Sequence, residues 1–334
     1  MPGIGVISNR NARLNKLYPK LKDRMAFVVG RGGEVASTGS LDDAQQAIEE
    51  FKRVGIDMLA ISGGDGTAHR TIELLIKTYG QDPLPPVLLL PTGTQNMVPG
   101  SFGIRDSGVA TLLLAQARYR HNLPMRCLRR NVLKVNEHHS FMFGLGIGPR
   151  FLQEYYRRGK TTPAGAASLL WEYGVDAARG GVVARGLTAT IGIRARLDDG
   201  AEIEMQPHSV FASFIEELSL RFKLFPRAGW DEKLFEVLIV EGHPALVVKA
   251  LPFLWVGSIR PLQGIKRHMV RRLELVLDHP EPYTLDGEVY EPTDRLVISA
   301  GPELRFVVPG LRLRPADKHL RHDRVGPWEL RFLV

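Results

Sequence analysis

Apolar and polar residues alternate in blocks along the first third of the chain, a pattern that predicts strands and helices in turn. Short apolar runs of the kind found in buried strands occupy residues 3–9, 57–62 and 86–91. Apolar residues recur every three or four positions, as in helices with one buried face, at 40–55, 67–80 and 107–119. Strands that alternate with helices of this length need crossover connections, so we expect a parallel sheet covered by helices on both faces.

From about residue 126 onward, short strand-like segments replace this alternation. Residues 187–197 alternate apolar and polar positions, and Asp199-Gly200 behind them is a typical hairpin turn. The series continues at 209–215, 233–240, 271–277, 283–291 and 295–301, and a helical insertion is expected near 150–179.

This pattern predicts two domains. An α/β domain with a parallel sheet is expected at 1–125, and an antiparallel β-sandwich domain at 126–311. The tail at 312–334 is compatible with packing back on the first domain.

Composition and charge narrow the function only slightly. The 334 residues include 44 Lys and Arg against 36 Asp and Glu, and the net charge of +8 suits phosphorylated ligands, nucleic acid and anionic membranes alike. The lone cysteine, Cys127, excludes an internal disulfide framework and fits a reducing compartment.

A membrane-spanning helix is not expected, because no stretch approaches the ~18 uncharged apolar residues that one needs. The closest stretch, 245–257, contains Lys249 and Pro252. We expect Phe253, Leu254 and Trp255 within it to belong to the core, with docking on a bilayer or lining of an acyl pocket as the alternatives. The chain is therefore expected to be cytoplasmic and to meet a membrane only from its surface.

A glycine-rich turn stands between the strand predicted at 57–62 and the helix predicted to begin near Thr67. Gly63 and Gly64 let the backbone turn sharply and approach a phosphate, toward which the first helical amides point. Asp65 lies in the same turn, where a carboxylate repels phosphate; holding magnesium or accepting a proton would explain it. The alternative is a purely structural turn in which Asp65 caps the helix.

A second turn of this kind follows the strand predicted at 86–91. Gly93, Thr94 and Asn96 again offer backbone amides and short polar side chains. Adjacent parallel strands bring their carboxyl ends to the same edge of a sheet, so both turns are expected to lie together. They predict a phosphate-binding cradle.

The sequence does not match other known phosphate-binding or metal-binding motifs. The Gly-Lys-Thr at 159–161 has Glu154 where a Walker A loop needs glycine, and no predicted strand precedes it. The spaced glycines Gly144, Gly146 and Gly148 lie in the β-rich half instead of after the first strand. No histidine has partners at the spacing of metal ligands.

The order of the motifs resembles the diacylglycerol kinase catalytic family, which includes bacterial diacylglycerol kinases, YegS-type lipid kinases, and sphingosine and ceramide kinases. The matching segments are GGDGT at 63–67, PTGTQN at 91–96, GLGIGPRFL at 144–152, FKLFPRAGWDEKLFEVLIV at 222–240 and LDGE at 285–288. GGDGT alone is shared with NAD kinases, so the later segments carry the distinction. The resemblance implies a Rossmann-like N-terminal domain that binds ATP and a β-rich domain that offers the lipid.

The resemblance also implies roles for single residues. The residues that match the nucleotide loops are Asn9, Gly63, Gly64, Gly66, Thr67, Gly93, Thr94 and Asn96. Asp231 matches an aspartate of the family's magnesium site, and Glu288 matches its proposed base. Asp65 is expected to serve magnesium or a water network, and an exchange of roles with Glu288 stays open. Phosphoryl transfer to an alcohol needs a carboxylate near the hydroxyl, although Asp286-Gly287 also fits an ordinary hairpin turn.

The expected function is that of an ATP- and Mg²⁺-dependent lipid kinase in the cytoplasm, peripheral to the inner face of the membrane, with no nucleic-acid partner. Basic groups at 118–130, 157–160 and 266–272 fit either anionic headgroups or a solvated surface. Two other functions stay open: NAD kinase-like phosphorylation of a ribose, and nucleotide binding by a regulator without catalysis. The sequence determines neither the lipid nor the oligomeric state, and a homodimer is one state that it allows.

Overall fold

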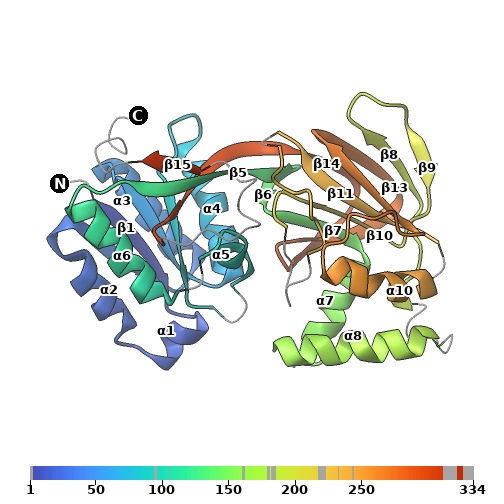
Figure 1. Ribbon diagram of the computed structural model, residues 1–334, viewed down its shortest axis with the longest axis horizontal. Coiled ribbons are helices and arrows are strands. Elements are labelled where there is room, and N and C mark those ends of the chain that lie inside the picture. The colour runs from blue at the N-terminus through green and yellow to red at the C-terminus, as the bar shows by residue number, and fades with distance from the viewer. Residues whose placement is uncertain are drawn as a thin grey trace. The chain divides into compact units, whose positions relative to one another are not determined.

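The structure, a computed structural model, describes residues 3–93, 96–104, 106–159, 162–178, 181, 186–216, 223–231, 233–242, 244–310 and 322–325. The chain divides into two compact units: unit 1 comprises residues 1–130 and 302–334, and unit 2 comprises residues 131–301. Two long strands, β5 (Met125–Val135) and β14 (Glu288–Val308), run from one unit into the other (Figure 1).

Unit 1 is built on a parallel sheet with the strand order β2-β1-β3-β4. Its strands are β1 (Ile4–Asn9), β2 (Gly33–Thr38), β3 (Met58–Gly63) and β4 (Val87–Pro91). The end of β14 adds a further parallel strand beside β4, where Phe306 lies opposite Val87. Toward the C-terminus, β15 (His322–Val325) pairs antiparallel with the first residues of β5.

Helices cover both faces of this sheet (Figure 1). On one face, α2 (Leu21–Val29) and α6 (Gly108–Arg120) bury Met25 and Leu112 against alternate residues of the strands. On the other face lie α3 (Leu41–Val54) and α4 (Asp65–Tyr79), which pack against each other. The short elements are α1 (Arg13–Leu17), η1 (Gly30–Gly32) and α5 (Met97–Ser101).

Local sequence signals explain where α3 begins and ends. The hydroxyl of Ser40 accepts a hydrogen bond from the amide of Asp43, whose carboxylate accepts one from the amide of Ser40. This reciprocal pair satisfies two amides that have no partner within the helix. Gly55 ends the helix in the left-handed conformation, with φ of 74°.

Unit 2 is built from antiparallel strands in the order β12-β11-β10-β7-β13-β14. Their bounds are β7 (Met142–Gly146), β10 (Ser209–Ser213), β11 (Phe235–Val240), β12 (Ile265–Val270) and β13 (Arg272–Leu285). The short strand β6 (His138–Ser140) pairs with β5, and β8 (Ile193–Leu197) pairs with both β9 (Ile203–Met205) and β13. The helices are α7 (Ile147–Arg157), α8 (Pro163–Ala178) and α10 (Pro244–Trp255).

An irregularity in β13 organises the strands of unit 2. The pairing with β14 shifts its register between Val276 and Glu281, which bends the strand. The first half of β13 then pairs with β8, and the second half pairs with β7. A large apolar core fills the space inside, with Phe143, Phe235 and Leu285 fully buried in it.

The fold class predicted from the sequence is confirmed: unit 1 is α/β with a parallel sheet, and unit 2 is rich in antiparallel strands. The helical insertion predicted near 150–179 corresponds to α7 and α8. Several elements were not predicted, among them α2, α10 and the strands β2, β5, β7 and β12. In the described part of the chain, no helix has both the length and the apolar character needed to cross a bilayer.

The strand predicted over 187–197 is wrong in its first half, because β8 begins only at Ile193. Side chains bind the first residues of this segment, whereas Ile191 and Gly192 bond to the backbone of Pro207 and Asp278. The carbonyl oxygens of Thr188 and Ala189 contact the side chains of His208 and Arg150, respectively. The apolar alternation of this segment therefore reflects the burial of Ile191, not strand pairing.

Candidate active site

The two predicted glycine turns lie in direct backbone contact in unit 1. The strands β3 and β4 are neighbours, with Gly63 opposite Pro91 at their carboxyl ends. The amide of Thr92 donates to the carbonyl of Gly63 at 3.2 Å. A Cβ atom on Gly93 would lie 2.3 Å from the Cα of Gly64, so any side chain at position 93 would force the turns apart.

The first turn leads directly into α4. Gly64 is the N-cap and supplies no side-chain cap, and the first helical hydrogen bond joins the amide of Ala68 to the carbonyl of Gly64 at 3.0 Å. The amides of residues 65–67 precede that bond at the positive end of the helix dipole. Gly63 must be glycine because a Cβ there would lie 2.3 Å from the Cβ of Thr67. A half-exposed helix start of this kind suits an anion such as phosphate.

Asp65 connects the first turn to the second. The helix begins at Asp65 and not near Thr67, so the expectation that Asp65 caps its own helix is wrong. Its Oδ1 atom accepts a hydrogen bond of 2.9 Å from the amide of Val98, in the first turn of α5. The carboxylate thus holds the segment that follows the second turn against the start of α4.

Asn96 shapes the second turn through its own backbone. It adopts the left-handed conformation with φ of 52°, and its side-chain Oδ1 accepts from the amide of Gly93 at 3.0 Å. Its Nδ2 atom donates to the carbonyl of Gly93 at 3.1 Å. Thr94, which was predicted to bind nucleotide, lies outside the described residues.

Asn9 joins a third segment to this edge of the sheet. Its Nδ2 atom donates to the hydroxyl of Thr67 at 2.8 Å, and its Oδ1 atom accepts from the amide of Asn11 at 2.8 Å. The buried side chain of Asn15 in α1 donates to the carbonyl of Asn9 at 2.6 Å. The structure therefore brings Asn9, Gly63, Gly64, Thr67, Gly93 and Asn96 together, with Gly66 in the first turn of α4.

Glu288 is placed by a two-residue turn in unit 2. β13 ends at Leu285 and β14 begins at Glu288, so Asp286 and Gly287 form the turn, with φ of 50° and 91°. The buried carboxylate of Asp286 accepts from the amides of Phe141 and Met142 at 3.0 and 2.8 Å. It thereby fixes the turn against β7.

Tyr156 shares the surroundings of Glu288. Its hydroxyl donates to the carbonyl of Gly287 at 2.9 Å. Partial burial and the negative charge of Glu288 raise the pKa of this tyrosine, so it stays a neutral donor at physiological pH. Glu288 itself is half-buried.

Asp231 lies on an exposed turn of unit 2, where its Oδ1 atom accepts from the amide of Lys233 at 2.7 Å. The loop that contains it is fixed by Glu236, the carboxylate in the otherwise apolar strand β11. Glu236 is fully buried and accepts from the amide of Arg227 at 2.8 Å and from Arg267 at 2.9 Å. Burial raises the pKa of Glu236, while Arg227 and Arg267 oppose that shift.

The carboxylates predicted to serve magnesium and catalysis belong to both units. Within the described part of the chain, no three His, Cys, Asp or Glu residues cluster closely enough to hold a metal ion. Asp65 belongs to unit 1, whereas Asp231 and Glu288 belong to unit 2. The carboxylates of Asp65 and Asp231, which were predicted to serve magnesium, are hard oxygen ligands of the kind that this ion prefers.

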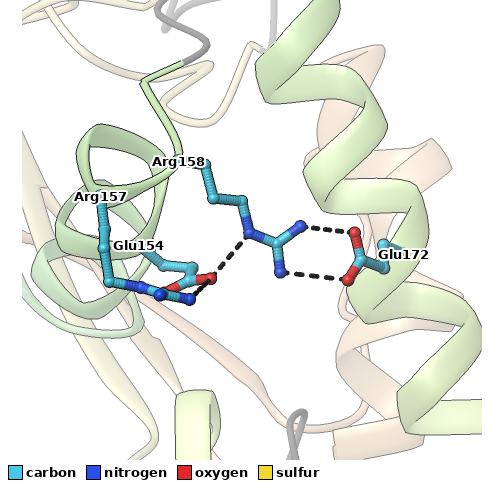
Figure 2. Close-up of polar contacts among 4 residues, drawn as sticks. All are labelled: Glu154, Arg157, Arg158 and Glu172. Atoms are coloured by element: carbon cyan, nitrogen blue, oxygen red, sulfur yellow. Dashed lines mark hydrogen bonds and ion pairs between the residues drawn. The ribbon is translucent and has the colours of Figure 1, made fainter.

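In the basic segment around residue 157, Arg157 and Arg158 form ion pairs with glutamates (Figure 2). Arg157 and Arg158 contact Glu154 at 2.6 and 2.7 Å, and Arg158 also reaches Glu172 at 2.6 Å. The arginines lower the pKa of Glu154 to about 2. In the basic segment 266–272, likewise, Lys266 pairs with Glu241 and Arg267 with Glu236.

Comparison with known proteins agrees with this geometry. Residues 6–126 match the Diacylglycerol kinase catalytic domain. The resemblance predicted from the sequence is confirmed for this part of the chain.

Two curated relatives are named "Probable lipid kinase YegS". The protein from Salmonella arizonae is 32% identical over 139 residues, and the one from Shigella flexneri is 28% identical over 136 residues. In both cases the match covers 41% of this chain and 44% of the relative. The chain thus matches less than half the length of these relatives.

Solved structures extend the likeness of fold to both units. A crystal structure of a diacylglycerol kinase from Bacillus anthracis aligns with a TM-score of 0.61 at 16% identity, covering 91% of this chain and 96% of that one. Another Bacillus anthracis crystal structure covers the same shares with a TM-score of 0.67. At this identity the likeness shows the fold alone.

Replacing Gly93 by alanine tests the contact between the turns. The new Cβ would lie 2.3 Å from the Cα of Gly64, so the backbone must move, and we expect a loss of roughly 1–3 kcal/mol in the free energy of unfolding. Urea denaturation of the full chain measures it. Gly100→Ala is the matched control, because its Cβ would meet nothing within 4 Å. Equal stability of the two variants would contradict the proposed close approach.

Replacing Glu236 by glutamine tests the buried ion pair. The charge of Arg267, whose side chain is 7% exposed, would lose its partner, and we expect a destabilisation of roughly 3–5 kcal/mol. Glu241→Gln removes the neighbouring pair with Lys266, which is more exposed, and should cost less than about 1 kcal/mol. Urea denaturation compares the two, and similar losses would refute a special role for Glu236.

Proposed function

We propose that the chain is a lipid kinase that transfers the γ-phosphoryl group of ATP to a hydroxyl group of a lipid. The observation that carries this proposal is the backbone contact between Gly64 and Gly93 at the carboxyl ends of β3 and β4. It lies in the part of the chain that matches the diacylglycerol kinase catalytic domain. The names of the YegS relatives support a lipid as the acceptor.

The glycine turns are proposed to bind the phosphates of ATP. The amides of residues 65–67 at the start of α4 supply donors and a favourable dipole, and the absence of side chains at Gly63, Gly64 and Gly93 allows a close approach. Asn9 and Thr67 hold the neighbouring loop in place through their hydrogen bond. Mg²⁺, when bound, would neutralise phosphate charge that builds up during transfer.

Glu288 is proposed to act as the general base. Its carboxylate would accept the proton of the lipid hydroxyl, whose oxygen then forms a bond to the γ-phosphorus while the bond to the β-phosphate oxygen of the leaving ADP breaks. The clamp that Asp286 forms with the amides of Phe141 and Met142 keeps the turn before Glu288 rigid. Rigidity matters because proton transfer requires hydrogen-bond distance.

Asp65 is proposed to position the second turn through its bond to Val98 and to serve the magnesium ion with its negative charge. Asp231 is proposed as a further magnesium ligand, on the match to the family. The fixed loop around it supports a defined position, since Glu236 anchors the amide of Arg227 nearby. The lipid itself is left open among diacylglycerol, sphingoid bases and ceramide.

A phosphate-transfer assay tests the proposed function. The full chain, incubated with Mg²⁺ and ATP labelled in the γ-phosphate, should label at least one lipid of a panel of diacylglycerol, sphingosine and ceramide in vesicles. Glu288→Gln should reduce the rate by at least about a hundredfold, because the amide cannot accept the proton. Glu291→Gln, an exposed glutamate of the same strand, should leave the rate unchanged.

Two results would count against this function, and two others would change the roles of single residues. NAD is added to a parallel reaction. If NAD becomes labelled and the lipids do not, the acceptor is a ribose. If no acceptor becomes labelled, the result favours a regulator without catalysis. Full activity of Glu288→Gln would remove it as the base. The variant Asp65→Asn keeps an oxygen that can accept from the amide of Val98, so full activity in this variant would limit Asp65 to its structural contact.

A further inference from the structure

Helix α10 presents an exposed apolar surface on unit 2. Four large apolar residues at and beyond its C-terminal end are about half exposed or more: Phe253 at 48%, Trp255 at 55%, Val256 at 69% and Ile259 at 51%. We call these four residues the α10 apolar surface. The expectation that Phe253 and Trp255 belong to the core is wrong; only Leu254 between them does, at 4% exposure.

The helical period explains why the apolar surface faces outward. Ala250 and Leu254, four residues apart, are buried in a small core with Phe225 and Leu238. At 3.6 residues per turn, Phe253 and Trp255 project to the two flanks of the buried side, about 100° from Leu254, and Val256 follows the end of the helix. The helix is therefore anchored to unit 2 by its buried side, while the side chains of the α10 apolar surface are about half exposed or more.

The end of α10 is held in a defined conformation. The amide of Ser258 donates to the carbonyl of Phe253 at 2.9 Å, and Gly257 adopts the left-handed conformation with φ of 71°. A Cβ on Gly257 would lie 2.9 Å from the Cβ of Lys223, so the turn rests closely on the neighbouring loop. The exposed aromatic side chains thus stand on a fixed scaffold.

The charges around this surface are of one sign. The segment 244–260 contains Lys249 and Arg260 and no acidic residue. Both cations are exposed, and Lys249 lies one turn before Phe253 on the same side of the helix. Trp and Phe flanked by Lys and Arg are the residue types that concentrate at the interface between lipid and water.

We infer that the α10 apolar surface docks unit 2 onto a lipid bilayer that contains anionic lipids. Phe253, Trp255, Val256 and Ile259 would enter the boundary between headgroups and acyl chains, while Lys249 and Arg260 contact the anionic headgroups. Helix α10 lies beside α8, where Trp171 is 77% exposed, on one side of the strands of unit 2 (Figure 1). None of these residues is among those proposed for the reaction, so we expect the surface to bind without ATP.

Vesicle flotation without nucleotide tests this inference. The full chain is mixed with vesicles of phosphatidylcholine alone or with phosphatidylglycerol added. The double variant Phe253→Ser/Trp255→Ser should bind at least about tenfold less to the mixed vesicles. Phe27→Ser, which alters an aromatic side chain that is 87% exposed in unit 1, should bind like the unaltered chain. Lys249→Glu/Arg260→Glu should lose the preference for phosphatidylglycerol.

A second measurement does not depend on these variants. The chain has four tryptophans, so Trp171→Phe/Trp230→Phe/Trp328→Phe leaves Trp255 as the only one. Brominated lipids should then quench the fluorescence of Trp255. Absence of quenching with bound vesicles, or unchanged binding of the Phe253→Ser/Trp255→Ser variant, would overturn the inference. A dimer in solution that this variant dissociates, with vesicle binding unchanged, would assign the surface to a second copy instead.

Discussion

The close approach of two backbone turns, at Gly64 and Gly93, is the constraint on which the proposed phosphate site of unit 1 depends. Parallel pairing of β3 and β4 brings the carboxyl ends of both strands to one edge, and glycine at both positions lets the chain turn there without a clash. Asp65 then joins the start of α4 to α5, and Asn9 adds the loop after β1. The amides of residues 65–67 are thereby fixed before any ligand arrives, which is the preorganisation that phosphate binding requires.

In unit 2, the loops that carry the proposed site residues are fixed by buried carboxylates that accept backbone hydrogen bonds. Asp286 binds two amides at the start of β7 and fixes the turn before Glu288, while Glu236 binds the amide of Arg227 and fixes the loop before Asp231. Such groups are costly to bury without partners, so each must be matched by donors on several segments. The residues proposed for the chemistry, Glu288 and Asp231, can then remain half-buried and exposed, respectively.

Much of this architecture was predictable from short-range patterns. In unit 1, the strands β1, β3 and β4 and the helices α3, α4 and α6 follow the apolar period. Ser40 and Gly55 mark the ends of α3, and the turn residues Asp286 and Gly287 mark a hairpin. What escaped prediction depends on contacts between distant segments. The bond between Asp65 and Val98 spans 33 positions, and the pair of Glu236 and Arg267 spans 31. The local sequence indicates the pair of Glu236 and Arg267 only by the presence of a carboxylate, Glu236, in the otherwise apolar strand β11. Helix α10 was missed because its apolar residues lie on both sides, only one of which is core.

Hydrogen exchange in the presence and absence of ATP and Mg²⁺ tests the central claim most directly, because it reports on the backbone amides themselves. In the full chain, nucleotide is expected to slow exchange in peptides that cover residues 63–68 and 96–98, where the two turns meet. Nucleotide binding that leaves exchange in both segments unchanged, and slows it elsewhere, would contradict the assignment of the glycine turns as the phosphate site.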